Sequence, residues 1–526
     1  MKTTIKGTLS NFYSALSDKI NSLTALNASL ILAAIFFLPA LAVYNVTDAH
    51  GDIAEYLNDA FRAVGGEMPY RDFWLLLPPG KAFLPAMVLL VFGHSVNAVM
   101  ISALVINVAV GITSYFLCLE ATSSKRASFV SALLVFFNGS ISLSYGLAYP
   151  HTWVLLVFLS AIFAVRYFKS ASSSDILAAG LFAGSAFFFE FFLVGSYCFA
   201  VVSAILYHSR AKEGRFSPAL VPLAMFFFSA VVVVSAELAA MRQIAFRALY
   251  TIVIDAPSHG TSLNLPYLKE SLFSLESMII SYAPVLLVAC FFRGLRGKLP
   301  SGPSAVLVFF FVWVLAAFPK ALGRSDLNHV AQSVTPMYFF FAAYMAHFSL
   351  ADQKAVGAYK YFPRILMAGV AILLVFDVEK FFEHSINNVF RQRQIVQTPR
   401  GRLEFTDLAL AGEVNEIISA IEAKSKEGDY IFVAPWSLPP LYAMTNRKNP
   451  TYYDSMMDIE VRPALWKENS VCSSILEKNA KIAVLSAPEK SPMGASGARP
   501  MQIIEKCVEG NFSLVRRTEH FLIYAK

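Results

Sequence analysis

The sequence predicts a polytopic α-helical membrane protein of about eleven transmembrane helices, followed by a small α/β domain. Of the 526 residues, 56% are hydrophobic and only 15% are charged, whereas soluble domains carry about 25% charged residues. Apolar runs, many of them close to the roughly 20 residues that cross a bilayer, recur along positions 1–380. From 381 onward, short helices and strands alternate with polar loops. A cytosolic enzyme is therefore excluded.

The chain opens with a membrane anchor. Its first apolar run covers 26–44, and the many runs that follow favour an uncleaved anchor over a signal peptide. The later apolar runs lie near 97–118, 127–146, 152–166, 175–207, 217–240, 275–292, 303–319, 334–350 and 365–380.

The net charge of +7 indicates how the spans are oriented. Lysine and arginine concentrate in short linkers between apolar runs, and such linkers stay in the cytoplasm. The run 175–207 has basic linkers at both ends, so we expect a helical hairpin with Glu190 near its outer turn. The N-terminus is then cytoplasmic, and everything after residue 380 is extracytoplasmic. The basic excess therefore gives no reason to expect a nucleic-acid partner.

This topology places several long polar segments on the outer side. They are the first outer loop, 45–96, a second loop, 241–274, and the tail from about 381, with a shorter polar loop at 320–333. Within the first loop, the apolar stretch 83–92 is too short to span, so we expect it to be interfacial or re-entrant.

The tail is expected to fold as a small α/β layer structure. Helices are predicted over 407–424, 461–479 and 500–508, strands over 430–435 and 481–486, and one or two closing strands over 513–524. Cys472 and Cys507 lie in this region and are able to pair if it is extracytoplasmic, but two free thiols are an equally good reading.

Acidic residues follow the first span directly. Asp48, Asp52 and Glu55 lie there, and Asp52 is placed to cap a helix running to about Val64. Carboxylates at a membrane edge are costly, so some of them need a functional reason. For Asp48, Glu55 and Asp59 individually, capping or a solvated face is the simpler interpretation.

For Asp52, a resemblance to a known family favours a functional role over helix capping. Residues 65–80 read Gly-Gly-Glu-Met-Pro-Tyr-Arg-Asp-Phe-Trp-Leu-Leu-Leu-Pro-Pro-Gly, with Phe-Gly at 92–93. The stretch 52–93 resembles the first outer loop of GT-C membrane glycosyltransferases that use polyprenyl-phosphate sugars, namely bacterial relatives of protein O-mannosyltransferases and aminoarabinose transferases. Residues 323–329 and 429–451 are similar to two further segments of that group. The resemblance implies a GT-C-like fold for 1–380 and an appended extracytoplasmic domain for 381–526.

The resemblance also implies roles for individual residues. Asp52 falls on the family's acidic position, which is taken to activate the acceptor hydroxyl, but Ile53 follows where many relatives have Glu. Asp48 therefore remains a competitor as the catalytic base. We expect Arg324, Lys320 and His329 to bind the donor phosphate, since cations suit that charge; ordinary headgroup contact is the alternative. The remaining substrate-binding candidates are Arg71, Tyr70 and Glu190. For Arg71, the alternative to phosphate binding is a structural ion pair with a carboxylate of the loop.

Together these observations predict an inverting glycosyltransferase at the outer face of the bacterial cytoplasmic membrane. The donor is expected to be a polyprenyl-phosphate sugar, and the acceptor a hydroxyl of a lipid, glycan or protein. No cofactor is expected; the chemistry allows a divalent metal, but no ligand cluster in the sequence indicates one. The rival interpretations are a transporter or flippase of lipid-linked saccharides and a catalytically inactive scaffold.

Overall fold

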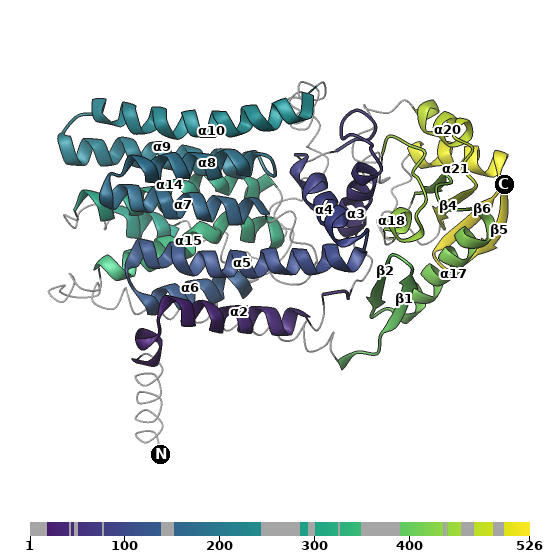
Figure 1. Ribbon diagram of the computed structural model, residues 1–526, viewed down its shortest axis with the longest axis horizontal. Coiled ribbons are helices and arrows are strands. Elements are labelled where there is room, and N and C mark those ends of the chain that lie inside the picture. Colours follow the sequence, from purple (N-terminus) through teal and green to yellow (C-terminus); the bar gives the residue numbers. More distant parts are fainter. Residues whose placement is uncertain are drawn as a thin grey trace, which may run out of the picture.

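The computed structural model shows a bundle of long helices with the α/β tail beyond one of its ends (Figure 1). The residues that the structure describes are 18–41, 44–46, 51–75, 78–137, 152–242, 285–292, 300–323, 327–348, 390–434, 438, 440–453, 468–487 and 499–526.

The helices of the bundle follow the apolar runs of the sequence. Among the described residues, five helices are long and apolar enough to cross a membrane, which makes this a multi-pass membrane protein. The predicted total of about eleven stays a prediction, because the run 365–380 and part of 275–292 lie outside the described residues. The bundle contains α2 (Ala25–Leu41), α5 (Val96–Thr122), α6 (Lys125–Phe137), α7 (Thr152–Ser170), α8 (Ser173–Phe187), α9 (Phe192–Glu213), η3 (Ser217–Ala219), α10 (Leu220–Met241), α14 (Ser301–Gly323) and α15 (Leu327–Phe348).

The start of α2, the α5–α6 turn and the end of α7 lie at the end of the bundle that faces away from the tail (Figure 1), and basic side chains of these segments make contacts there. There the ammonium of Lys125 donates to the carbonyl of Leu23 at 2.6 Å, and Arg166 pairs with Glu120 at 2.9 Å. These contacts tie the start of α2, the α5–α6 turn and the end of α7 together. The helices thus alternate in direction as the linker charges predict.

The predicted hairpin over 175–207 is confirmed as α8 and α9, and Glu190 lies in the turn between them. Close helix packing holds this hairpin. A Cβ on Gly180 of α8 would lie 2.2 Å from the carbonyl oxygen of Phe226, so only glycine lets α10 approach this closely. On the other side, the hydroxyl of Ser196 in α9 donates to the carbonyl of Ala316 in α14 at 2.9 Å.

The first outer loop contributes two short helices between the bundle and the tail (Figure 1). α3 (Gly51–Val64) covers the predicted helix, but it begins at Gly51, so Asp52 lies in its first turn and the prediction that Asp52 caps it is wrong. α4 (Gly80–Phe92) has 13 residues and ends at Gly93, which adopts φ 83°. It is therefore too short to span, as predicted.

The expected outer loop 320–333 is wrong. α14 continues to Gly323 and α15 begins at Leu327. α14 continues through Lys320, Ala321 and Leu322, which are good helix formers.

The tail has three layers, as its alternating pattern predicts. Its four-stranded sheet has the order β3-β4-β6-β5, with β3 parallel to β4 and the other pairs antiparallel. One sheet face packs on α17 and the other on α20 and α21, because successive side chains of a strand point to opposite faces. These elements are β3 (Ile431–Val433), β4 (Ile482–Ser486), β5 (Ser513–Arg517), β6 (Phe521–Ala525), α17 (Leu408–Lys424), α20 (Glu468–Glu477) and α21 (Arg499–Asn511).

Two parts of the tail were not predicted. They are the antiparallel hairpin of β1 (Gln394–Thr398) and β2 (Gly401–Phe405) and the short helix α18 (Leu441–Thr445). Both lie where the tail meets the first outer loop. The N–H of Val96 donates to the carbonyl of Arg400 at 2.9 Å, and one apolar core contains residues of α3, α4, α5 and the tail. The tail therefore shares its core with the loop.

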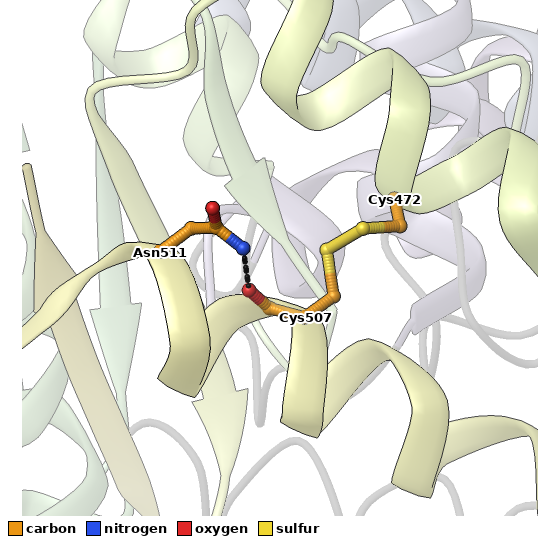
Figure 2. The surroundings of a disulfide bond; sticks show 3 residues. All are labelled: Cys472, Cys507 and Asn511. Carbon is orange, nitrogen blue, oxygen red and sulfur yellow. Dashed lines mark hydrogen bonds between the residues drawn. A yellow bond between two sulfur atoms is a disulfide. The ribbon is translucent and has the colours of Figure 1, made fainter.

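A disulfide joins two helices of the tail (Figure 2). It links Cys472 of α20 to Cys507 of α21, with their Cα atoms 6.0 Å apart. The amide of Asn511 donates to the carbonyl of Cys507 at 2.8 Å, one turn further along α21. The sequence left this pairing open, and the structure forms it.

Candidate functional site

Three charged side chains from separate elements meet at the tail-facing end of the bundle. Glu190 comes from the α8–α9 turn, Lys320 from the last turn of α14 and Lys81 from the first turn of α4. A carboxylate oxygen of Glu190 lies 3.5 Å from the ammonium of Lys320. Glu190 is 8% exposed and Lys81 is 5% exposed. Since buried charges need partners, the three residues form one electrostatic unit.

Backbone contacts set the geometry of this cluster. The N–H of Gly80 donates to the carbonyl of Phe188 at 2.8 Å, so the start of α4 is fixed to the turn that carries Glu190. A Cβ on Gly80 would lie 2.5 Å from that same oxygen, which explains the glycine of the Pro-Pro-Gly motif. The Ser196–Ala316 hydrogen bond then fixes the α8–α9 turn relative to α14 and Lys320.

The cluster combines two cations with one anion. Burial opposes ionisation of Glu190, but Lys320, Lys81 and the backbone N–H of Phe192 together outweigh it and hold the pKa of that carboxyl below its ordinary value. Glu190 is therefore an anion that pairs with Lys320 and is stabilised by the charge of Lys81. A pair of ammonium groups at the end of a membrane bundle suits an anionic headgroup such as a phosphate.

Of the six other residues expected at the donor or acceptor, four have side chains that the structure does not describe. Asp52 is in the first turn of α3 and His329 in the first turn of α15, each placed by its backbone alone. Asp48 and Arg324 lie outside the described residues. In the sequence, Arg324 directly follows the last residue of α14, and α14 is also the helix that carries Lys320. The roles of these four residues stay predictions.

Arg71 lies apart from the cluster. Its guanidinium pairs with the adjacent Asp72 at 2.6 Å, and its side chain is 54% exposed. Hydrogen bonding from Arg71 lowers the pKa of the Asp72 carboxyl. The ion pair that was the alternative for Arg71 is thus present, because a tight turn brings the two neighbouring side chains together.

Tyr70 is fully buried, with 0% of its surface exposed. Burial raises the pKa of its phenol well above the usual value, and Asp59 and Tyr452 add to this shift. A side chain with no exposed surface does not reach a ligand in this conformation. We therefore reassign Tyr70 from substrate binding to the organisation of the first outer loop.

Sequence reasoning missed two buried charged residues. Lys81 directly follows the Pro-Pro-Gly motif, and a lysine at the start of an apolar stretch was the available signal. The expectation of a solvated Asp59 is wrong, since it is 1% exposed. Its spacing of seven residues from Asp52, two helical turns, could have indicated a shared face of α3.

A second cluster lies in the tail. Single ligand atoms of Glu413, Glu519 and His520 lie within 4.8 Å of one another. Glu413, however, already accepts hydrogen bonds from the Thr518 hydroxyl and from the His520 N–H at 2.9 Å, and its other oxygen lies 2.6 Å from Nδ1 of His520. These contacts tie α17 to the β5–β6 turn, so we interpret the cluster as structural.

The comparisons with known proteins identify the fold. No protein-family model matches the chain, and no curated protein matches it by sequence. The chain resembles ArnT from Cupriavidus metallidurans bound to undecaprenyl phosphate, with a TM-score of 0.54 at 11% identity over 94% of this chain and 97% of ArnT. The apo state of the same ArnT gives a TM-score of 0.50 at 11% identity, over 95% and 98%. At this identity the matches show the fold alone, and the chain has an ArnT-like fold.

Proposed function

We propose that this chain is a GT-C-type membrane glycosyltransferase that transfers a sugar from a polyprenyl phosphate to an acceptor hydroxyl. The observation that carries the proposal is the buried cluster of Lys81, Glu190 and Lys320 at the tail-facing end of an ArnT-like bundle. The ArnT structure holds undecaprenyl phosphate, a ligand whose phosphate stays at the membrane surface while its chain lies in the hydrocarbon.

The two lysines suit the donor phosphate. Lys320 is held by Glu190, and Lys81 is held by the contact between Gly80 and Phe188. The Lys320 ammonium and the backbone of Lys81 are therefore fixed before a ligand arrives, which limits the reorganisation needed when negative charge develops on the phosphate. Arg324, next to the end of α14, is the expected third cation.

The proposed reaction is a single displacement. The acceptor oxygen forms a bond to the anomeric carbon while the bond from that carbon to the phosphate oxygen breaks. The hydroxyl proton passes to the carboxylate of Asp52, and the electron pair of the broken bond stays on the polyprenyl phosphate, facing Lys81 and Lys320. One displacement inverts the anomeric centre. Asp48 remains the competitor for the base.

We place the site at the outer face of a bacterial cytoplasmic membrane, with the N-terminus in the cytoplasm. Two features support this orientation: basic side chains gather at the opposite end of the bundle, and the tail contains a disulfide. The acceptor class, lipid, glycan or protein, would follow from mass spectrometry of cell-envelope glycans with and without the protein.

Purified protein in nanodiscs with undecaprenyl-phosphate sugars tests the proposal. We expect release of undecaprenyl phosphate in the presence of acceptor, and loss of release in Lys81→Ala. Binding without release would instead identify an inactive scaffold. Translocation with the sugar still attached would identify a transporter, which the position of all three charges at helix ends disfavours.

A further inference from the structure

One short segment of the tail, residues 449–453, contacts the 70–74 turn of the first outer loop. The hydroxyl of Tyr452 donates to the carbonyl of Tyr70 at 2.9 Å, and the N–H of Trp74 donates to the carbonyl of Tyr452 at 2.7 Å. Arg62 of α3 donates to the carbonyl of Thr451 at 3.1 Å. The segment thus binds both ends of the 70–74 turn.

The segment is rigid in its own right. The side-chain oxygen of Asn449 accepts from the N–H of Thr451 at 2.8 Å and from its hydroxyl at 2.9 Å. The amide of Asn449 donates to the carbonyl of Tyr453 at 2.8 Å. Asn449 and Thr451 are each 2% exposed. Because its polar groups are satisfied internally, the segment presents a fixed surface to the loop.

The 70–74 turn depends on such outside support. Tyr70 adopts φ 63°, a left-handed conformation that is unfavourable for a residue with a Cβ. Arg62, 6% exposed, pairs with Glu67 at 2.7 Å, donates to the carbonyl of Asp72 at 3.0 Å and lies over the ring of Phe73. Contacts from α3 and from the tail together hold this conformation.

The turn packs against apolar residues that neighbour the charged cluster in the sequence. Tyr70, Phe73 and Leu75 form one buried apolar cluster with Ala82, the neighbour of Lys81, and with Met241. Phe188 and Phe191, which flank Glu190 in the α8–α9 turn, pack against the same cluster. A displacement of the turn would therefore move the backbones that carry Lys81 and Glu190.

We propose that the 449–453 segment is a positioning element of the donor site and that Tyr452 is its positioning residue. The segment holds the 70–74 turn, and the turn supports the two backbones, joined by the hydrogen bond from Gly80 to Phe188, that carry Lys81 and Glu190. The site is thus incomplete without the tail. This inference rests on the proposed function for its ligand, but its structural part can be measured without activity.

The test compares two tyrosine-to-phenylalanine variants of the full chain in nanodiscs. Tyr452→Phe removes the hydroxyl that holds Tyr70. Tyr442→Phe is the matched control, because it removes a buried hydroxyl whose partner, the N–H of Val433 at 2.8 Å, lies inside the tail. Hydrogen exchange of peptides covering 68–92 and 186–194 is measured, together with binding of undecaprenyl phosphate and thermal unfolding.

We expect faster exchange in both peptides and about 3- to 10-fold weaker binding in Tyr452→Phe, with wild-type values in Tyr442→Phe. The melting temperature of Tyr452→Phe should fall no further than that of the control. Unchanged exchange in Tyr452→Phe, or equal effects in both variants, would overturn the inference. If wild type fails to bind undecaprenyl phosphate while exchange still rises in Tyr452→Phe alone, the positioning role is supported and the proposed function is overturned.

Discussion

The carbonyl oxygen of Phe188 occupies the space that a side chain at Gly80 would need, and it accepts the N–H of Gly80 at 2.8 Å. Lys81 follows Gly80, and Glu190 lies two residues after Phe188. This one backbone contact therefore fixes the distance between two charged residues that are far apart in the sequence. It also gives the Pro-Pro-Gly motif a physical reason that is independent of any ligand.

Gly80→Ala should separate the start of α4 from the α8–α9 turn, because the new Cβ would lie 2.5 Å from the Phe188 oxygen. We expect undecaprenyl phosphate to bind about tenfold more weakly, which corresponds to about 1.4 kcal/mol. Gly195→Ala in nearby α9 is the control, since a Cβ there would meet no atom of the described residues within 4 Å, and alanine should stabilise the helix. Wild-type affinity in Gly80→Ala would show that the contact between Gly80 and Phe188 does not determine the geometry of the binding site.

Glu190→Gln should lower the stability of the bundle, because Lys320 and Lys81 lose their buried carboxylate. Removing one partner of a buried pair costs about 3–5 kcal/mol, and we expect the lower end because the Lys320 side chain is 22% exposed. Lys320→Met in the Glu190→Gln background should restore part of the loss. Thermal unfolding in detergent gives both values.

The stabilising effect of Glu190 should depend on pH. Its folded pKa lies below the ordinary 4.5, so its ionisation stabilises the fold above pH 4.5, and this contribution is lost as the pH falls through the folded value. The difference in melting temperature between wild type and Glu190→Gln should therefore shrink as the pH is lowered below 4.5. A difference that stays constant from pH 7 to acid would argue against an ionised Glu190.

Asp52→Asn should reduce transfer by about 10²- to 10⁴-fold, the usual contribution of a general base, while membrane insertion and donor binding persist. Asp48→Asn is the matched variant four residues earlier. Turnover of undecaprenyl-phosphate sugar by each purified variant decides between them. If Asp52→Asn keeps wild-type turnover and Asp48→Asn is inactive, the base is Asp48.

Local patterns predicted the parts of this fold that depend on hydropathy and charge alone. The hairpin of α8 and α9 followed from basic linkers at both ends of one apolar run, and Glu190 was placed in its turn correctly. The tail helix α17 was predicted because apolar residues recur at helical spacing, and the structure adds that Asp407 caps it. These signals each lie within one element.

The contacts that build the site join distant elements, so no local pattern contained them. The Glu190–Lys320 pair depends on how α9 packs against α14 through Ser196. The burial of Asp59 depends on the tail covering α3, which hydropathy does not show. The contact between Tyr70 and the tail, in which the Tyr452 hydroxyl donates to the carbonyl of Tyr70, also joins distant segments. The motif alone therefore suggested that Tyr70 binds substrate.

Transfer should survive removal of divalent metals. We expect the ammonium groups of Lys81 and Lys320 to face the phosphate. Their positive charges can neutralise the phosphate charge without a bound metal ion. We therefore expect EDTA to leave turnover unchanged, while Lys81→Ala lowers it in the same assay. Loss of turnover in EDTA and recovery with added magnesium would show that a metal ion binds the phosphate together with the lysines.

Reduction of the disulfide should destabilise the tail selectively. A bond between Cys472 and Cys507 closes a loop with a sequence separation of 35, and such bonds typically contribute about 2–4 kcal/mol. Dithiothreitol, or replacement of both cysteines by serine, should lower the unfolding temperature of the tail. Thiol titration of unreduced, denatured protein should find three thiols, those of Cys118, Cys198 and Cys290. Five titratable thiols in protein purified from bacterial membranes would contradict both the pairing and an extracytoplasmic tail, because a tail folded outside the cytoplasm would meet oxidising conditions.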